Sequence, residues 1–246
     1  MIDWFDIAVP FTHRIINAGH VFSVRKDGEV EWQVNKADTV RGSYDSSMRV
    51  RSNDLNGETG MAKTLFISGN PAKFLQGHNV VGSDDICLLA FLTVNAIAKQ
   101  FNLVTSHSTL QEGVALYTPI YSWRNGVPIV LNDFQSWPLL SGQFEVHKLD
   151  INYMFEVPHE ADVDAFLDAL ATKTRTRTAR AINDRGTVYT NKHSRYWCIK
   201  AYNKYREILR GGKDHNLPPE LLNTPLVSFA FRKVRFELVL HSKELK

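Results

Sequence analysis

The sequence predicts an α+β protein with an antiparallel-rich central sheet and helices packed on one face of it. Three observations support this class. Most apolar stretches alternate with polar residues at the period of two typical of strands, and few follow the helical period. Several alternating stretches are joined by short turns rich in Asn, Asp and Gly, as in hairpins. Of the 246 residues, 43% are hydrophobic, which is enough to bury a substantial core.

Strands and turns dominate the first 70 residues. Residues 20–34 form two β-like runs around a Lys-Asp-Gly turn, and residues 47–52 and 63–69 read as further strands. Residues 70–85 are rich in turn formers. A helix is then expected over about 85–101, capped by Asp84 or Ser83.

The second half repeats these signals. An Asn125-Gly126 turn marks another hairpin within residues 116–133. The remaining predicted elements are a strand at 144–157, a helix at 159–173, strands at 186–190 and 195–204, a short helix at 217–223 and a last strand at 232–242. The order of elements, with mainly hairpin connections, favours an antiparallel sheet.

Strand periodicity separates the side chains of residues 195–204 into two faces. Lys200, Tyr202 and Lys204 point one way, whereas the alternate positions are apolar. The same pattern places Asp150 and Asn152, and also Arg235 and Glu237, on the polar faces of two other strands. The apolar partners on the opposite faces are Leu149, Ile151, Tyr153, Trp197, Ile199, Ala201, Phe236, Leu238 and Leu240. If the three strands are neighbours, their polar groups converge.

Such a convergence has a chemical use. The carboxylates of Asp150 and Glu237 and the amide oxygen of Asn152 are hard ligands that suit Mg²⁺ or Mn²⁺. A phenol of pKa about 10 is mostly protonated at neutral pH, so Tyr202 needs a nearby cation to act as a nucleophile. Lys204 is expected to stabilise charge on tyrosinate or phosphate. Polar outer faces with cross-strand ion pairs are also ordinary in amphipathic sheets, and periodicity leaves this alternative open.

Four segments resemble the plus-strand replication initiators of filamentous phages. They are NPAKFLQGHNVVGSDD at 70–85, KLDIN at 148–152, HSRYWCIKAYNK at 193–204 and VRFE at 234–237, in the order of that family. The last three also resemble the rolling-circle initiators of some small staphylococcal-type plasmids. The resemblance implies a fold like that of rolling-circle HUH endonucleases.

The resemblance implies a site-specific, metal-dependent enzyme that nicks and rejoins one strand of origin DNA. Tyr202 would form a 5′-phosphotyrosine link and leave a free 3′-hydroxyl, with Lys204 assisting. Metal ligation would fall to Asp150 and Glu237, with His78 and Asn152 as further candidates, because the chain lacks the His-hydrophobic-His motif of the wider superfamily. Tyr205 is a weaker alternative nucleophile.

DNA contacts are expected from basic side chains and from one amide, that of Gln76. The candidates are Lys73, Gln76, Lys173, Arg175, Arg177, Arg180 and Arg235. The mild net charge of +3 is compatible with such a partner. The expected partners are origin DNA, melted or extruded as a hairpin, and the host helicase and polymerase of the family.

The chain is expected to form one nuclease domain over 1–246. Within it, an N-terminal lobe at 1–140 carries the Gln-Gly-His-Asn loop and a catalytic lobe occupies 141–246. Two distant cysteines and the absence of a signal-like N-terminus favour the cytoplasm of a bacterial host, without membrane association. Two alternatives stay open: a non-catalytic single-stranded nucleic-acid binder, and a metal nuclease that uses water.

Overall fold

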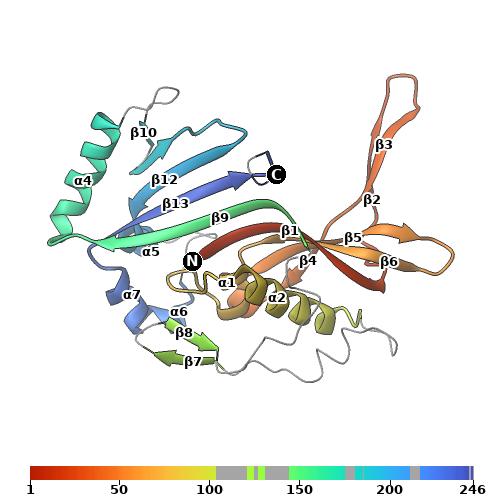
Figure 1. Cartoon of the computed structure of the whole chain (residues 1–246), viewed down its shortest axis with the longest axis horizontal. Coiled ribbons are helices and arrows are strands. Elements are labelled where there is room, and N and C mark those ends of the chain that lie inside the picture. The colour runs from red at the N-terminus through yellow and green to blue at the C-terminus, as the bar shows by residue number, and fades with distance from the viewer. Residues whose placement is uncertain are drawn as a thin grey trace.

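The computed structural model describes residues 1–103, 121–124, 127–130, 144–174, 181–184, 186–210, 217–243 and 245. In this part of the chain, one nine-stranded antiparallel sheet forms the body, in the order β10-β11-β12-β13-β9-β1-β6-β5-β4 (Figure 1). Its strands are β1 (Ile2–Arg14), β4 (Asp38–Arg41), β5 (Ser47–Asn56), β6 (Met61–Gly69), β9 (Glu145–Glu156), β10 (Ala181–Asp184), β11 (Thr187–Thr190), β12 (Trp197–Asn203) and β13 (Lys233–His241). The predicted α+β class is confirmed.

Two hairpins lie outside the main sheet. They pair β2 (His20–Val24) with β3 (Val30–Asn35), and β7 (Tyr121–Arg124) with β8 (Val127–Val130), as their turn signals predict. The β2–β3 hairpin projects away from the body (Figure 1). The helical elements are η1 (Ser43–Asp45), α1 (Pro71–Gln76), α2 (Ile86–Gln100), α4 (Glu160–Lys173), α5 (Lys204–Arg210), α6 (Pro219–Leu222) and α7 (Pro225–Ala230).

The sheet joins the two halves of the chain. β1 pairs with β6 on one side and with β9 on the other, so strands from before and after residue 140 share one hydrogen-bonded layer. The backbone of Met1 also exchanges hydrogen bonds with Asn152: each backbone nitrogen donates to the other residue's carbonyl at 2.8 Å. The first residues of the chain therefore lie at the centre of the sheet.

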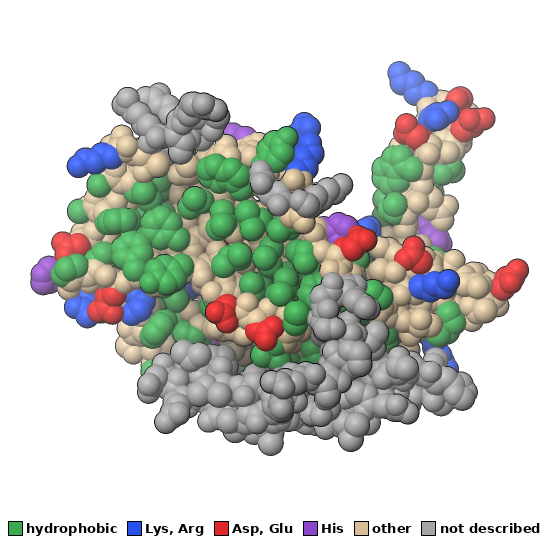
Figure 2. Space-filling view, in the orientation of Figure 1, with side chains coloured by type: hydrophobic (Ala, Val, Ile, Leu, Met, Phe, Trp, Pro, Cys, Tyr) green, Lys and Arg blue, Asp and Glu red, His purple; other side chains and the backbone are tan. Residues whose placement is uncertain are grey.

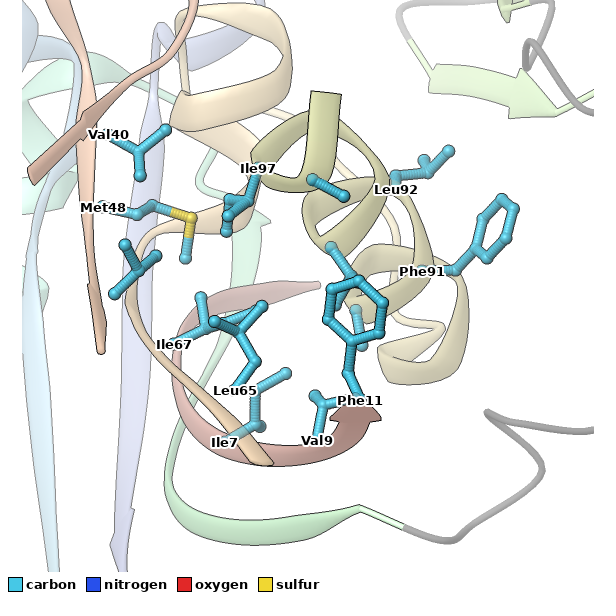
Figure 3. Packing of buried hydrophobic residues seen from close by; sticks show 14 of the residues in the cluster. Ile7, Val9, Phe11, Val40, Met48, Leu65, Ile67, Phe91, Leu92 and Ile97 are labelled. Atoms are coloured by element: carbon cyan, nitrogen blue, oxygen red, sulfur yellow. The ribbon is translucent and has the colours of Figure 1, made fainter. Parts of the chain in front are cut away.

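Helix α2 covers one face of the N-terminal strands. Its buried side chains Phe91, Leu92 and Ile97 belong to the same core cluster as Ile67 and Leu65 of β6 (Figure 3). The side chain of Asp85 caps the helix by accepting a hydrogen bond from the Leu88 backbone nitrogen, one residue after the predicted Asp84. The helix predicted over about 85–101 is confirmed.

Helix α4 covers the same face of the sheet at its other end. Val163 and Leu167 pack with Val188, Ala201 and Val234. Between α2 and α4, the apolar face of β9, β13 and β12 is only partly covered, and Figure 2 shows hydrophobic side chains gathered there. Tyr153 on this face is 71% exposed.

Two segments differ from the prediction. Within 70–85, expected to be turns, Asn70 caps α1 by accepting from the Lys73 backbone nitrogen, and Pro71 occupies the first helical turn. The strand at 195–204 stops at Asn203, and Lys204 begins α5. Among the described residues, no helix is both long and apolar enough to cross a membrane.

Candidate active site

Strand register brings the predicted groups together. Across the sheet, Tyr202 of β12 pairs with Arg235 of β13, and Glu237 of β13 pairs with Asn152 of β9. Asp150 pairs with Val239, one alternate position along. Because directly opposed residues of antiparallel strands point to the same face, these groups share one side of the sheet. The predicted convergence of Asp150, Tyr202 and Glu237 is therefore observed.

The phenol of Tyr202 is held by a carboxylate. Its hydroxyl donates a 2.5 Å hydrogen bond to Glu237 Oε1. Burial raises the pKa of Tyr202 well above its ordinary value, and the neighbouring Arg235 opposes this only in part. The phenol is thus neutral at pH 7, with a proton acceptor already in contact.

Glu237 also meets two cations. Lys200 Nζ lies 3.2 Å from Oε2, and Arg235 Nε lies 3.2 Å from Oε1. The carboxylate is almost fully buried, so these partners compensate the cost of removing its charge from water.

Asp150 has a different environment. It is 6% exposed, and Lys148 Nζ lies 3.3 Å from its Oδ1. Burial raises the pKa of Asp150 to about 6, although Lys148 and Lys200 work against this shift. Asn152 is buried beside it, and its Nδ2 has no hydrogen-bond partner in the described part of the chain.

Arg235 proved to be a structural cation, which corrects its predicted DNA contact. Its side chain is fully buried, with Nη2 2.9 Å from Asp3 Oδ1 and Nη1 donating to the Asn79 carbonyl oxygen. A guanidinium with these partners faces Asp3, Asn79 and Glu237, and no surface of it is left for a phosphate.

Asp3 is a site residue that sequence reasoning missed. Its Oδ1 accepts 2.8 Å hydrogen bonds from the side chains of Asn70 and Asn79, in addition to pairing with Arg235. Burial opposes its ionisation, but the charges of Arg235 and Lys204 outweigh burial and lower the pKa of Asp3 to about 2. The presence of an acid within the apolar run MIDWF was the sequence signal that could have identified Asp3 as a site residue.

A register shift on β1 explains how Asp3 reaches this face. Ile2 pairs with Ile151 but Trp4 pairs with Asp150, so Asp3 is an extra residue opposite β9. Such a bulge turns two consecutive side chains to the same side of a sheet. Asp3 thereby joins Trp4 on the polar face.

The polar face is also more closed than predicted, and Lys204 is the clearest case. It is 2% exposed and is paired with Glu207 and with Asn79 Oδ1, the latter at 3.1 Å. Burial lowers the pKa of Lys204 to about 8, with Arg235 contributing in the same direction. Lys204 thus contacts Glu207 and Asn79, and this geometry favours a structural role for Lys204 over direct stabilisation of the Tyr202 tyrosinate.

His78 is not brought to the acids. It is buried in the loop after α1, where burial and the nearby Lys204 lower its pKa to about 4. Among the described residues, no three His, Cys, Asp or Glu side chains are grouped to hold a metal ion. A site for a divalent cation would have to rest on Asp150 and Glu237 without His78.

The DNA-contact candidates have mixed positions. The Gln76 amide nitrogen donates to the carbonyl oxygens of His78 and Val81, so it holds its own loop and is not free to read a base. Lys173 is exposed at the end of α4. Arg175, Arg177 and Arg180 lie outside the described residues. Tyr205, the alternative nucleophile, packs edge-on against Phe231 at 5.2 Å between ring centroids.

A broad open cavity of about 1150 Å³ borders the site. Tyr202, Glu237, Asp150 and Lys200 are on its wall. Cations from three other elements also border it, namely Arg49, Lys73, Arg206 and Arg210. Asp164, Asp168 and Glu207 line the same cavity, so its wall carries charges of both signs around the phenol.

Comparison with known proteins identifies the family of the chain. A family model for the N-terminal part of a phage replication-associated protein, Phage_CRI, matches residues 1–246. The chain belongs to this family. Among its relatives, the replication-associated protein of Enterobacteria phage I2-2 is 40% identical over 245 residues, which cover all of this chain and 63% of that protein. The predicted resemblance to phage plus-strand replication initiators is confirmed.

Proposed function

We propose that this member of the phage replication-associated family nicks and rejoins the plus strand at the phage origin through a phosphotyrosine intermediate. The observation that supports the proposal most directly is the hydrogen bond from the Tyr202 phenol to Glu237 Oε1, on the wall of a cavity edged with basic side chains. A tyrosine whose hydroxyl donates to a carboxylate has the geometry of a nucleophile with its base.

In the proposed step, the Tyr202 oxygen attacks the scissile phosphorus and transfers its proton to Glu237. The Tyr–O–P bond forms, the bond from phosphorus to the 3′-oxygen breaks, and that oxygen leaves as a hydroxyl after taking a proton from solvent. The reverse attack of a 3′-hydroxyl restores the phosphodiester and returns the proton to tyrosine. Storing the bond in an ester is what permits rejoining, which attack by water would forbid.

The cations around Glu237 suit this chemistry. Arg235 cannot move away because it is buried against Asp3, so its charge is fixed close to the reacting phenol. A preorganised positive charge stabilises the negative charge that develops on the phenol oxygen and the phosphate.

The carboxylates of Asp150 and Glu237 would hold Mg²⁺ or Mn²⁺. Their hard oxygens, from adjacent strands on one face, fit such an ion, and Asn152, directly opposite Glu237 and two residues from Asp150, could add its amide oxygen. A bound divalent ion would neutralise charge on the scissile phosphate. Asp150 is positioned for this role by β9 and has no contact with the phenol that would suggest another.

Specific nicking also requires that DNA be held. Arg49 is exposed on the wall of the cavity and can contact a phosphate. Arg206, also exposed there, is paired with Asp164 at 2.7 Å and would have to exchange that partner for a phosphate. Origin DNA as the substrate, and host helicase and polymerase as later partners, follow from family membership and are part of this proposal. The chain spans about 63% of the length of its relative from phage I2-2.

A single experiment tests the proposal. The protein is incubated with an origin oligonucleotide and Mg²⁺ or Mn²⁺, and a denaturant-resistant protein–DNA adduct is sought. Tyr202→Phe should abolish the adduct and leave DNA binding within a few-fold. Tyr189→Phe is the matched control, because Tyr189 borders the same cavity, where Lys192 lies over its ring.

The two alternatives predict other outcomes. Cleavage without an adduct would support a nuclease that uses water. Binding without cleavage, unaffected by loss of Asp150 or Glu237, would support a non-catalytic single-strand binder. Adduct formation that persists in Tyr202→Phe would refute the choice of nucleophile.

A further inference from the structure

We propose that Lys200 is a built-in counter-cation that occupies the place of a divalent ion between Glu237 and Asp150, and that metal binding requires it to swing out. This inference rests on the proposed function, because it concerns the pair of acids assigned there to the metal. It adds a control element: the chain supplies its own positive charge to the site until a metal ion replaces it.

The position of Lys200 supports this reading. It pairs in register with Glu237, and its ammonium lies 3.2 Å from Glu237 Oε2. It also interacts electrostatically with Asp150, so it faces both acids. A singly charged group thus stands where an ion shared by the two carboxylates would lie.

Exposure shows which partner can move. The side chains of Glu237 and Asp150 are each 8% exposed, whereas that of Lys200 is 31% exposed. The acids are held by the sheet, but the lysine stem can rotate its ammonium into the cavity. Arg235, the other cation on Glu237, has no exposed side-chain surface and is fixed by Asp3. On Glu237, Lys200 is therefore the exchangeable cation and Arg235 the permanent one. Lys148, whose side chain is 27% exposed and whose Nζ lies 3.3 Å from Asp150 Oδ1, is the corresponding exchangeable cation on Asp150.

The energies favour exchange. A partly exposed ion pair contributes little to stability, so a divalent ion at millimolar concentration can replace it. Keeping the ammonium in place beside a divalent cation would be repulsive. Once released, Lys200 points into the cavity, where its charge is available to a DNA phosphate.

Mn²⁺ binding to the full chain without DNA tests this role. Free Mn²⁺ is followed by its electron paramagnetic resonance signal as protein is added. Lys200→Met should bind Mn²⁺ about three- to fivefold more tightly than the unmodified chain, because no ammonium has to leave. Lys200→Arg keeps the charge and should bind Mn²⁺ within about twofold of the unmodified chain.

Two further variants control for fold and for charge. Lys200→Gln should behave as Lys200→Met does, and it replaces that variant if the methionine prevents folding. Lys233→Met removes a lysine that pairs with Glu156, outside the site, and should leave Mn²⁺ affinity unchanged. If the loss of any positive charge strengthened Mn²⁺ binding, Lys233→Met would bind Mn²⁺ more tightly as well as Lys200→Met.

Equal or weaker Mn²⁺ binding by both neutral variants would overturn the proposal. So would the absence of Mn²⁺ binding to every variant under the conditions of the nicking assay. Neither result bears on the phosphotyrosine adduct, which is measured separately and depends on Tyr202. Failure of this inference and failure of the proposed function are therefore distinguishable.

Discussion

Glu237 is the proposed proton acceptor for Tyr202. It accepts a hydrogen bond from Tyr202 and is paired with Lys200 and Arg235. Glu237→Gln keeps the size of the side chain but removes the proton acceptor. The rate of adduct formation should fall by about 10²–10⁴, with DNA binding changed only a few-fold. Timed denaturing gels measure it.

The matched control for that variant is Glu156→Gln. Glu156 also pairs with a lysine and an arginine on the sheet, but it lies outside the cavity. Its replacement should leave the rate of adduct formation unchanged. An unchanged rate in Glu237→Gln, with the melting temperature preserved, would remove Glu237 from the reaction.

Asp150 makes the affinity for Mn²⁺ depend on pH. Since burial raises its pKa from 3.8 to about 6, the metal-free protein must lose a proton from Asp150 before the carboxylate can ligate. Mn²⁺ affinity should therefore rise about tenfold per pH unit below pH 6 and flatten above it. Titrations between pH 5 and 8 check this, and Asp150→Asn should lose both the step and most of the affinity.

The raised pKa of Asp150 has the opposite effect on the free energy of unfolding: metal affinity rises with pH, whereas the stabilisation from Asp150 falls. A raised pKa means that the folded state holds this proton more tightly than the unfolded chain does. The resulting stabilisation is fully present below the unfolded value of 3.8 and is lost as the pH rises through about 6. Relative to Asp150→Asn, the metal-free protein should therefore have a higher free energy of unfolding in mild acid than at neutral pH. The comparison with Asp150→Asn cancels the contributions of the other titrating groups.

At the scale of elements, the start of β1 is the anchor of the site. Asp3→Asn would leave the buried charge of Arg235 without its carboxylate partner. The free energy of unfolding should fall by about 3–5 kcal/mol. Urea denaturation measures it. Asp6→Asn, which alters a half-buried acceptor of the Trp4 indole on the same strand, should cost less than about 1.5 kcal/mol.

The pH dependence of this anchor also has a defined sign. The pKa of Asp3 is lowered to about 2, so its contribution to stability is present above 3.8 and is lost as the pH falls through about 2. Stability that is insensitive to Asp3→Asn at pH 7 would show that Arg235 finds other compensation.

The turn after α1 is a second element that positions the site. Gly77 ends the helix with φ +83°, and a Cβ there would overlap the Tyr44 ring. Gly77→Ala should destabilise the fold by about 1–3 kcal/mol and displace Asn79, a partner of Arg235. Gly19→Ala is the control: its φ is +89°, but the added methyl meets open space, so about 1 kcal/mol is expected. Thermal unfolding and adduct formation separate the two.

For the whole molecule, the cavity makes a prediction about salt. Arg49→Ala should weaken DNA binding and reduce the slope of log affinity against log salt by about one, if Arg49 contacts a single phosphate. Arg25→Ala, near the turn of the projecting β2–β3 hairpin, should leave the slope unchanged. Fluorescence anisotropy over a salt series measures both. Equal slopes for Arg49→Ala and the unmodified chain would place the DNA elsewhere.

Local periodicity was enough to predict much of this protein. Alternation alone assigned Tyr202, Asp150 and Glu237 to polar strand faces. The helical period found α4, and a capping residue before an apolar run found α2, because these signals depend on residues within one element. Turn chemistry identified the β2–β3 and β7–β8 hairpins for the same reason.

The tertiary structure alone decided what covers the polar face. A bulge at Asp3 and the loop carrying Asn79 arrive from distant parts of the chain, and they bury Arg235 and Lys204, which the sequence pattern presented as exposed cations. A period of two tells which side chains share a face, but not which other segments pack onto it. The role of each charge at this site was therefore fixed by long-range contacts, because burial and neighbouring charges determine what an ionisable group can do.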